Sequence, residues 1–195
     1  MVLVFSTTLF LSAALLMSIQ PLFAKAILPL FGGAPQVWNI CMMFYQVLLL
    51  GGYLFAHWSS RLGRKGIYLQ LGLIALPLLM LPIANRVIPG SDFLITRPAS
   101  ALLWVLVSSV ALPFFVLSTL SPLLQRWLSY TTSKHAEDPY FLYAASNLGS
   151  FLGLLSYPLW IEPLWTTEQQ SAYWAMLYGV LMVGVMSCAV VVLRQ

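Results

Sequence analysis

Long runs of apolar residues, separated by short polar segments, follow one another along the whole chain. Windows of about 20 apolar residues, the length that crosses a bilayer core, recur six times. Pro77 and Pro82 interrupt the third window, which membrane helices tolerate where neighbours satisfy the freed carbonyls. The pattern predicts an all-α integral membrane protein with one six-helix domain over residues 1–195. The predicted spans are residues 2–23, 35–58, 67–83, 100–124, 140–159 and 172–193.

The composition agrees with this pattern and narrows the functions. Apolar residues make up 61% of the chain and charged residues 7%, far below the roughly 25% of soluble domains. The spans leave little chain for an appended catalytic domain, so we expect no enzyme. The net charge of +4 comes from basic residues in short loops, where they set membrane orientation, and we expect no nucleic-acid partner.

The basic residues predict which side of the membrane each loop occupies. Basic residues follow spans two, four and six on one side, and fewer lie on the other side. The positive-inside bias therefore places both termini in the cytoplasm, and we expect a multi-pass protein of the bacterial inner membrane. The first group is Arg61, Arg64, Lys65, Arg126, Lys134 and Arg194, and the second is Arg86 and Arg97.

Residues 24–26, AKA, have the small-x-small form of a signal-peptide cleavage site. No basic region precedes the apolar run, and the run is longer than that of a usual signal peptide. We therefore expect a retained membrane helix.

Lys25 is the first charged residue after 24 uncharged ones, and it stands between Pro21 and Pro29. We expect these prolines to prevent the first helix from continuing regularly, which places Lys25 just past its end, at the external interface. There it anchors the helix, or it holds an anionic ligand or lipid headgroup. Glu162 is predicted near the same surface, as an interfacial carboxylate, a partner of Lys25 or a cation ligand.

Asn39, Gln46 and Tyr53 are spaced by seven, which places them on one stripe of the second helix. We expect this stripe to face the bundle. It either makes interhelical hydrogen bonds or lines a cavity together with Gln20 and Asn147.

Two segments carry small residues at intervals of four, a pattern that allows helices to approach closely. They either pack within the monomer or contact another subunit. The first set is Ala145, Gly149 and Gly153, and the second is Ser171, Ala175 and Gly179.

Other candidate chemistry is sparse. Cys41 and Cys188 lie far apart inside apolar segments, with neither metal nor redox spacing. His57 and His135 have no predicted partner across the membrane. The sequence contains no catalytic triad pattern or phosphate-binding glycine loop. We expect no cofactor and no metal.

Residues 56–65, AHWSSRLGRK, resemble the loop between helices two and three of major facilitator transporters. Arg61, Gly63, Arg64 and Lys65 match that motif, while Ala56 and Ser60 stand where the family has glycine and aspartate.

A second resemblance is to the membrane region of bacterial proteins that fuse a facilitator-like part to a spermidine-synthase-like domain. It is carried by QPLFAK (20–25), LPLFGGAPQVWN (28–39) and YAASNLGSFLGLLSYPLWIEP (143–163). The resemblance implies half of a facilitator fold. A synthase-like part would follow the helices in such fusions, and we expect the six-helix part alone.

An internal similarity supports this architecture. SIQPLFAK (18–25) aligns with TLSPLLQR (119–126), 101 positions later, which corresponds to three spans. Because three is odd, the second copy would be inverted, as in the three-plus-three halves of facilitator folds. A coincidence between two apolar sequences is the alternative.

Two functions remain open at this level. The chain is a membrane subunit that anchors or organises a larger assembly through protein partners or a homodimer, without catalysis of its own. Alternatively, it is a half-size facilitator-like transporter that acts as a dimer or with a separate spermidine-synthase-like partner. We favour the first, because no acidic residue that would attract a polyamine lies inside a predicted span.

Overall fold

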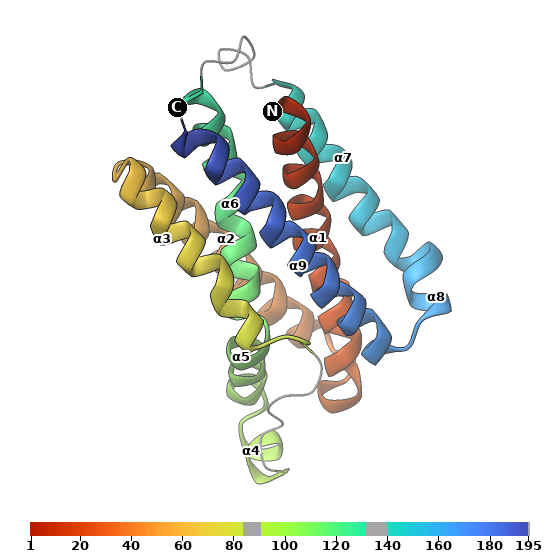
Figure 1. Ribbon diagram of the computed structural model, residues 1–195. Coiled ribbons are helices and arrows are strands. Elements are labelled where there is room, and N and C mark those ends of the chain that lie inside the picture. Colours follow the sequence, from red (N-terminus) through yellow and green to blue (C-terminus); the bar gives the residue numbers. More distant parts are fainter. Residues whose placement is uncertain (84–90, 132–139, 195) are drawn as a thin grey trace.

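The computed structural model describes residues 1–83, 91–131 and 140–194, and every regular element within these ranges is a helix (Figure 1). The predictions for Arg86, Lys134 and His135 lie outside the described residues. The elements are α1 (Val2–Phe31), α2 (Pro35–Ser60), α3 (Arg64–Ala75), η1 (Leu76–Leu79), α4 (Ser91–Thr96), α5 (Pro98–Ser109), α6 (Ala111–Ser129), α7 (Tyr140–Ser156), η2 (Tyr157–Ile161), α8 (Glu162–Leu164) and α9 (Thr167–Leu193).

The first helix is longer than predicted, because neither proline stops it. Pro21 and Pro29 both lie inside α1, which continues to Phe31 rather than ending at residue 23. A proline removes one backbone hydrogen bond, which a helix packed among neighbours tolerates. The stop comes at Gly32, whose φ of 69° suits glycine, and Pro35 then begins α2.

Two other predicted spans are interrupted. The third is α3 followed by the 3-10 turn η1, which contains Pro77. The fourth is bent by 60° between α5 and α6. Pro113 has no N–H to bond to the carbonyl of Ser109, which accounts for a break at this place.

The last two predicted spans have shifted bounds. The fifth is α7, which passes into a π-helical turn, η2, at Tyr157. The sixth, α9, begins at Thr167, five residues before the predicted start. A capping box of Thr166 and Gln169 fixes that start, with backbone-to-side-chain bonds of 3.3 and 3.0 Å.

In the described part of the chain, three helices are long and apolar enough to cross a membrane: α1, α2 and α9. The bent pair α5–α6 raises this number to four if it counts as one span. With 12 and 17 residues, α3 and α7 fall short by length. The protein is therefore all-helical in its described part with three or four membrane-length helices, and the six-span count stays a prediction.

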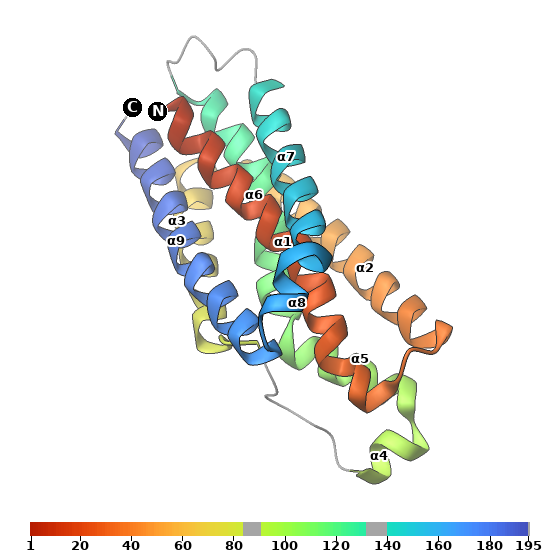
Figure 2. The same cartoon turned by 90° about the vertical axis from the view of Figure 1, so that its right-hand side faces the viewer.

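The helices form one bundle with α1 and α6 packed against each other (Figure 2). α1 also packs against α7 and α9, and α2 packs against α5 and α6. The two chain ends lie at the same end of the bundle (Figure 1). The α1–α2 turn and α4 lie toward the opposite end (Figures 1 and 2).

Glycines allow the closest of these contacts. Gly149 and Gly153 of α7 lie so near the α1 carbonyls of Phe10 and Ala14 that a Cβ atom would clash. Gly52 of α2 lies equally close to Ser118 of α6. α7 therefore meets the backbone of α1, and α2 meets the Ser118 side chain of α6, at positions where only glycine fits.

Polar side chains inside the bundle bond across helices. Gln70 of α3 donates to Thr119 of α6 at 2.8 Å. The hydroxyl of Tyr178 and the indole of Trp174, both in α9, donate to backbone carbonyls of α3 and α1 at 2.9 and 3.2 Å. These bonds satisfy groups that would be costly in an apolar interior.

Candidate functional site

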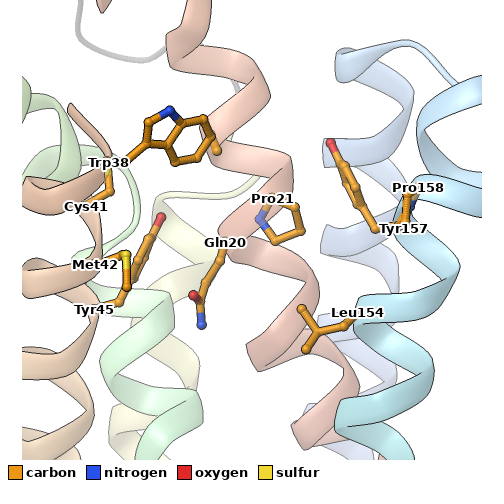
Figure 3. Close-up of a pocket in the computed structure, with 10 residues that line it drawn as sticks. Gln20, Pro21, Trp38, Cys41, Met42, Tyr45, Leu154, Tyr157 and Pro158 are labelled. Carbon is orange, nitrogen blue, oxygen red and sulfur yellow. The ribbon is translucent and has the colours of Figure 1, made fainter. Parts of the chain in front are cut away.

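A cavity of about 270 Å³ lies against the second half of α1, between α2 and the end of α7. We call it the α1 cavity. Met42 and Tyr45 of α2 lie on one side of α1, and Leu154 and Tyr157 lie on the other (Figure 3). Its wall is mostly apolar, so it fits a molecule with a substantial apolar part.

Two polar groups face this cavity from α1 and α2. Gln20 and Tyr45 both line it, and their side chains face the space between the two helices (Figure 3). The Tyr45 side chain is buried, and no described residue lies within hydrogen-bond distance of its hydroxyl. A buried hydroxyl without a partner is costly, which makes this oxygen a candidate polar group for the cavity.

Tyr157 lines the cavity at the end of α7, and hydrogen bonds outside the cavity hold its side chain in place. Its hydroxyl donates to the Gln170 side chain at 3.0 Å, and Gln170 donates to the Trp165 carbonyl at 2.8 Å. The π turn that begins at Tyr157 also gives Pro158 a place in the wall. Sequence reasoning missed Tyr45, Tyr157 and Gln170, because their identity as polar aromatic or amide residues does not reveal burial.

A second hollow of about 380 Å³, the Lys25 groove, shares Pro21, Trp38 and Tyr157 with the α1 cavity. Lys25 Nζ lies 3.5 Å from Glu162 Oε1, and the two side chains are 32% and 50% exposed. The structure therefore brings together these two predicted residues. Lys25 lies inside α1, six residues before its end, and not beyond the helix as predicted.

Three other predicted cavity residues lie elsewhere. Asn39, Gln46 and Asn147 are exposed, and none of them lines the α1 cavity. Tyr53 is also exposed, so the polar stripe of α2 does not face the bundle as we predicted. Hydropathy is nearly uniform around a membrane helix, and a seven-residue spacing identifies a stripe but not its direction.

Residues 61–65, which carry the first sequence resemblance, form the turn between α2 and α3. Gly63 adopts a φ of 55°, a left-handed value that favours glycine, and Arg61, Arg64 and Lys65 are exposed around it. Arg61 also lines a third hollow of about 490 Å³ between α2 and α6, with Arg126 opposite. We call this the arginine cavity.

The small-residue segments differ in what they contact. Gly149 and Gly153 lie against α1, and Ala145 is half-buried one turn earlier. In α9, Ser171 is buried and Ala175 is half-buried. A Cβ atom at Gly179 would meet nothing within 4 Å, whereas one at Gly184 would meet Thr8 of α1. The close approach of α9 to α1 is therefore at Gly184.

The α1 cavity and the Lys25 groove together combine an apolar wall with a few polar groups. An amide and an unpartnered hydroxyl face an apolar cavity, and an ion pair lies at its edge. A wall of this composition is chemically suited to an apolar molecule with a polar end. In searches of protein-family models, curated proteins and solved structures, none matched this chain.

Proposed function

We propose that the chain is a multi-pass subunit of the bacterial inner membrane that anchors or organises a larger assembly, without catalysis of its own. One observation carries the proposal. Gln46, near the middle of the membrane-length helix α2, and Asn147, near the middle of α7, present amide side chains on the outside of the bundle. These faces are suited to a protein partner.

Energetics supports a covered face. An amide without a hydrogen-bond partner in hydrocarbon costs several kcal/mol on alkane scales. Exposed residues of α9 include Met176, Val180 and Val183, which are suited to lipid. A partner helix that offers donors and acceptors would remove the cost at Gln46 and Asn147, so we infer that partners cover α2 and α7 and that lipid covers α9.

The helix neighbours support a facilitator-like unit with a three-plus-three inverted repeat. In such a repeat, span one corresponds to span four and span two to span five. The contact between α1 and α7 (spans one and five) then corresponds to the contact between α6 and α2 (spans four and two), and both contacts are present. Both pairs also meet at glycines. Gly52 and Gly153 stand 101 positions apart, the same separation as Pro21 and Pro122. This agreement favours a repeat over a coincidence.

The arrangement also supports the proposed orientation. Arg61, Arg64 and Lys65 follow α2, Arg126 lies in the last turn of α6, and Arg194 follows α9. These helix ends lie toward the end of the bundle that carries both termini (Figure 1). A cytoplasmic position for that end agrees with the positive-inside bias.

The α1 cavity favours a second candidate function, a half-size facilitator-like transporter. Gln20 and Tyr45 give the cavity polar binding points, and the ion pair of Lys25 and Glu162 lies at its edge. Transport would require a dimer or a separate spermidine-synthase-like partner, because six helices are half of a facilitator.

Site-specific photo-crosslinking tests both candidates. A benzoyl-phenylalanine is introduced at Gln46 or at Asn147, with Val183 of α9 as the matched control, and native membranes are irradiated. We expect a discrete crosslinked product from the first two positions only. A discrete product, either with a different chain or with a second copy of this chain, supports a face covered by protein, and its mass distinguishes a mixed assembly from a dimer of this chain. Equal labelling of lipid at all three positions would refute the covered face.

A further inference from the structure

The arginine cavity lies between the last turns of α2 and α6. Both of these helices end toward the end of the bundle that carries both termini (Figure 1). Two helices contribute its wall. Tyr53, His57, Ser60 and Arg61 come from α2 and its C-cap, and Pro122 and Arg126 come from α6. The cavity therefore joins basic residues that are 65 positions apart in the sequence.

The positions of both guanidinium groups are restrained by neighbours that carry no negative charge. Arg61 Nη2 lies 2.8 Å from His57 Nε2, and because arginine only donates, His57 is the acceptor. Arg126 Nε donates to the Tyr130 hydroxyl at 3.1 Å, with the guanidinium carbon 5.1 Å from the centre of that ring. Tyr130 in turn donates to the Ser60 carbonyl at 3.2 Å, which links α6 to α2.

No acidic side chain compensates these charges within the described part of the chain. The residues that line the arginine cavity include none, and the ion pair recorded among the described residues is that of Lys25 and Glu162. Two arginines line one hollow, and none of the residues that line it with them carries a negative charge, so this hollow is cationic and suits an anion.

The Lys25 groove has a similar set of residues, and unlike the arginine cavity it contains a carboxylate. Proline and base recur 101 positions apart, as Pro21 and Lys25 in the groove and as Pro122 and Arg126 in the arginine cavity. On the opposite wall, Glu162 of the groove and Arg61 of the arginine cavity are also 101 positions apart. The groove thus supplies its own counter-ion, whereas the arginine cavity has a second cation at the equivalent position.

We propose that the arginine cavity binds a phosphate group. A planar guanidinium donates two parallel hydrogen bonds to phosphate oxygens, and arginines on two helices match an anion with several acceptors. The volume of about 490 Å³ accommodates phosphate and its first substituents. The phosphate belongs to an anionic lipid headgroup or to a soluble phosphate compound, and the argument for this site does not rest on the partner proposed for α2 and α7.

The test uses the full chain in a neutral maltoside detergent, titrated at constant ionic strength. One arm uses inorganic phosphate, and the other uses mixed micelles that contain phosphatidylglycerol or phosphatidylcholine. The double variant Arg61→Gln/Arg126→Gln should weaken binding by roughly tenfold or more, because it removes both guanidinium groups that donate to the phosphate oxygens. The matched control is Arg64→Gln/Lys65→Gln, which removes equal charge from exposed residues outside the cavity and should change binding less than about twofold.

A second substitution leaves both arginines in place. Ser60→Asp adds a carboxylate to the cavity wall and should weaken phosphate binding about as strongly as the double variant, whereas Ser60→Asn should not. Binding in the phosphate arm supports a soluble compound, and selective binding of phosphatidylglycerol supports a headgroup. Absence of binding in both arms, or equal weakening by the double variant and its control, would overturn the proposal.

Discussion

The Lys25 groove and the arginine cavity lie toward opposite ends of the bundle, and in each a basic residue follows a proline by four positions. In the groove, Glu162 lies 3.5 Å from Lys25. In the arginine cavity, Arg61 occupies the corresponding position, and its near neighbour is the uncharged acceptor His57. Residues 101 positions apart therefore line one neutral hollow and one cationic hollow.

The comparison teaches that two hollows with similar walls can differ in the ion that they attract because of a single side chain. A neutral ion pair at the surface contributes little and attracts no particular ion. An uncompensated pair of arginines raises the local concentration of anions. A change in helix packing should remove one of the two hollows, and a change of charge at position 162 should make the two hollows alike.

The largest expected effect comes from separating α7 from α1. Gly153→Leu places a side chain against the Ala14 carbonyl, and backbone atoms cannot move aside cheaply. We expect a loss of about 3 kcal/mol in the free energy of unfolding. Thermal unfolding in detergent measures this loss. Because Tyr157, Pro158 and Glu162 follow α7, the Lys25 groove should be lost with it, while the arginine cavity between α2 and α6 should remain.

Gly179→Leu is the matched control for that substitution. A Cβ atom there meets nothing within 4 Å, and the site lies inside a long helix. The free energy of unfolding of this variant should change by less than about 1 kcal/mol, mainly because leucine has a better helix propensity than glycine. An equal loss at both glycines would contradict the close contact between α7 and α1.

The next effect in size converts the neutral groove into a cationic one. Glu162→Arg, combined with Arg61→Gln/Arg126→Gln, should raise the phosphate affinity roughly tenfold above that of the variant with the two arginine substitutions alone. The reason is that Lys25 would then share its groove with a second cation, as Arg126 does with Arg61. Phosphate titration of the combined variant measures the gain. Glu162→Gln in the same background, which only removes the carboxylate, should restore less.

These features were accessible from the sequence to different degrees. Apolar windows predicted a helical membrane protein, because their length reports directly on the bilayer. They did not predict that α1 continues through Pro21 and Pro29, since tolerance of a proline depends on neighbouring helices. The start of α9 was readable from the Thr166–Gln169 capping box, which the hydropathy windows ignored.

The site was less predictable than the fold. Opposite charge and similar predicted depth were enough to suggest that Lys25 and Glu162 meet. The direction of the Asn39–Gln46 stripe was wrong, because both sides of a membrane helix are apolar and no moment indicates the core. Tyr45 and the arginine cavity depend on contacts between helices far apart in the sequence, which spacing along one helix does not contain.

The smallest expected effect concerns the ion pair itself. Lys25→Met removes a bond between side chains that are 32% and 50% exposed, so solvent screens most of its energy. Such a pair contributes about 0–1 kcal/mol, and the methionine retains apolar contact with the groove. Thermal unfolding should therefore be nearly unchanged, and the amount of assembled protein in membranes should be preserved.

The double variant Lys25→Met/Glu162→Gln isolates the pair, because any coupling beyond the two single changes belongs to the interaction. A loss above about 2 kcal/mol in the single variant would contradict a screened surface pair. An intact assembly that loses binding in the α1 cavity would instead assign Lys25 to ligand recognition, with its ammonium as the charge that the ligand meets at the cavity edge.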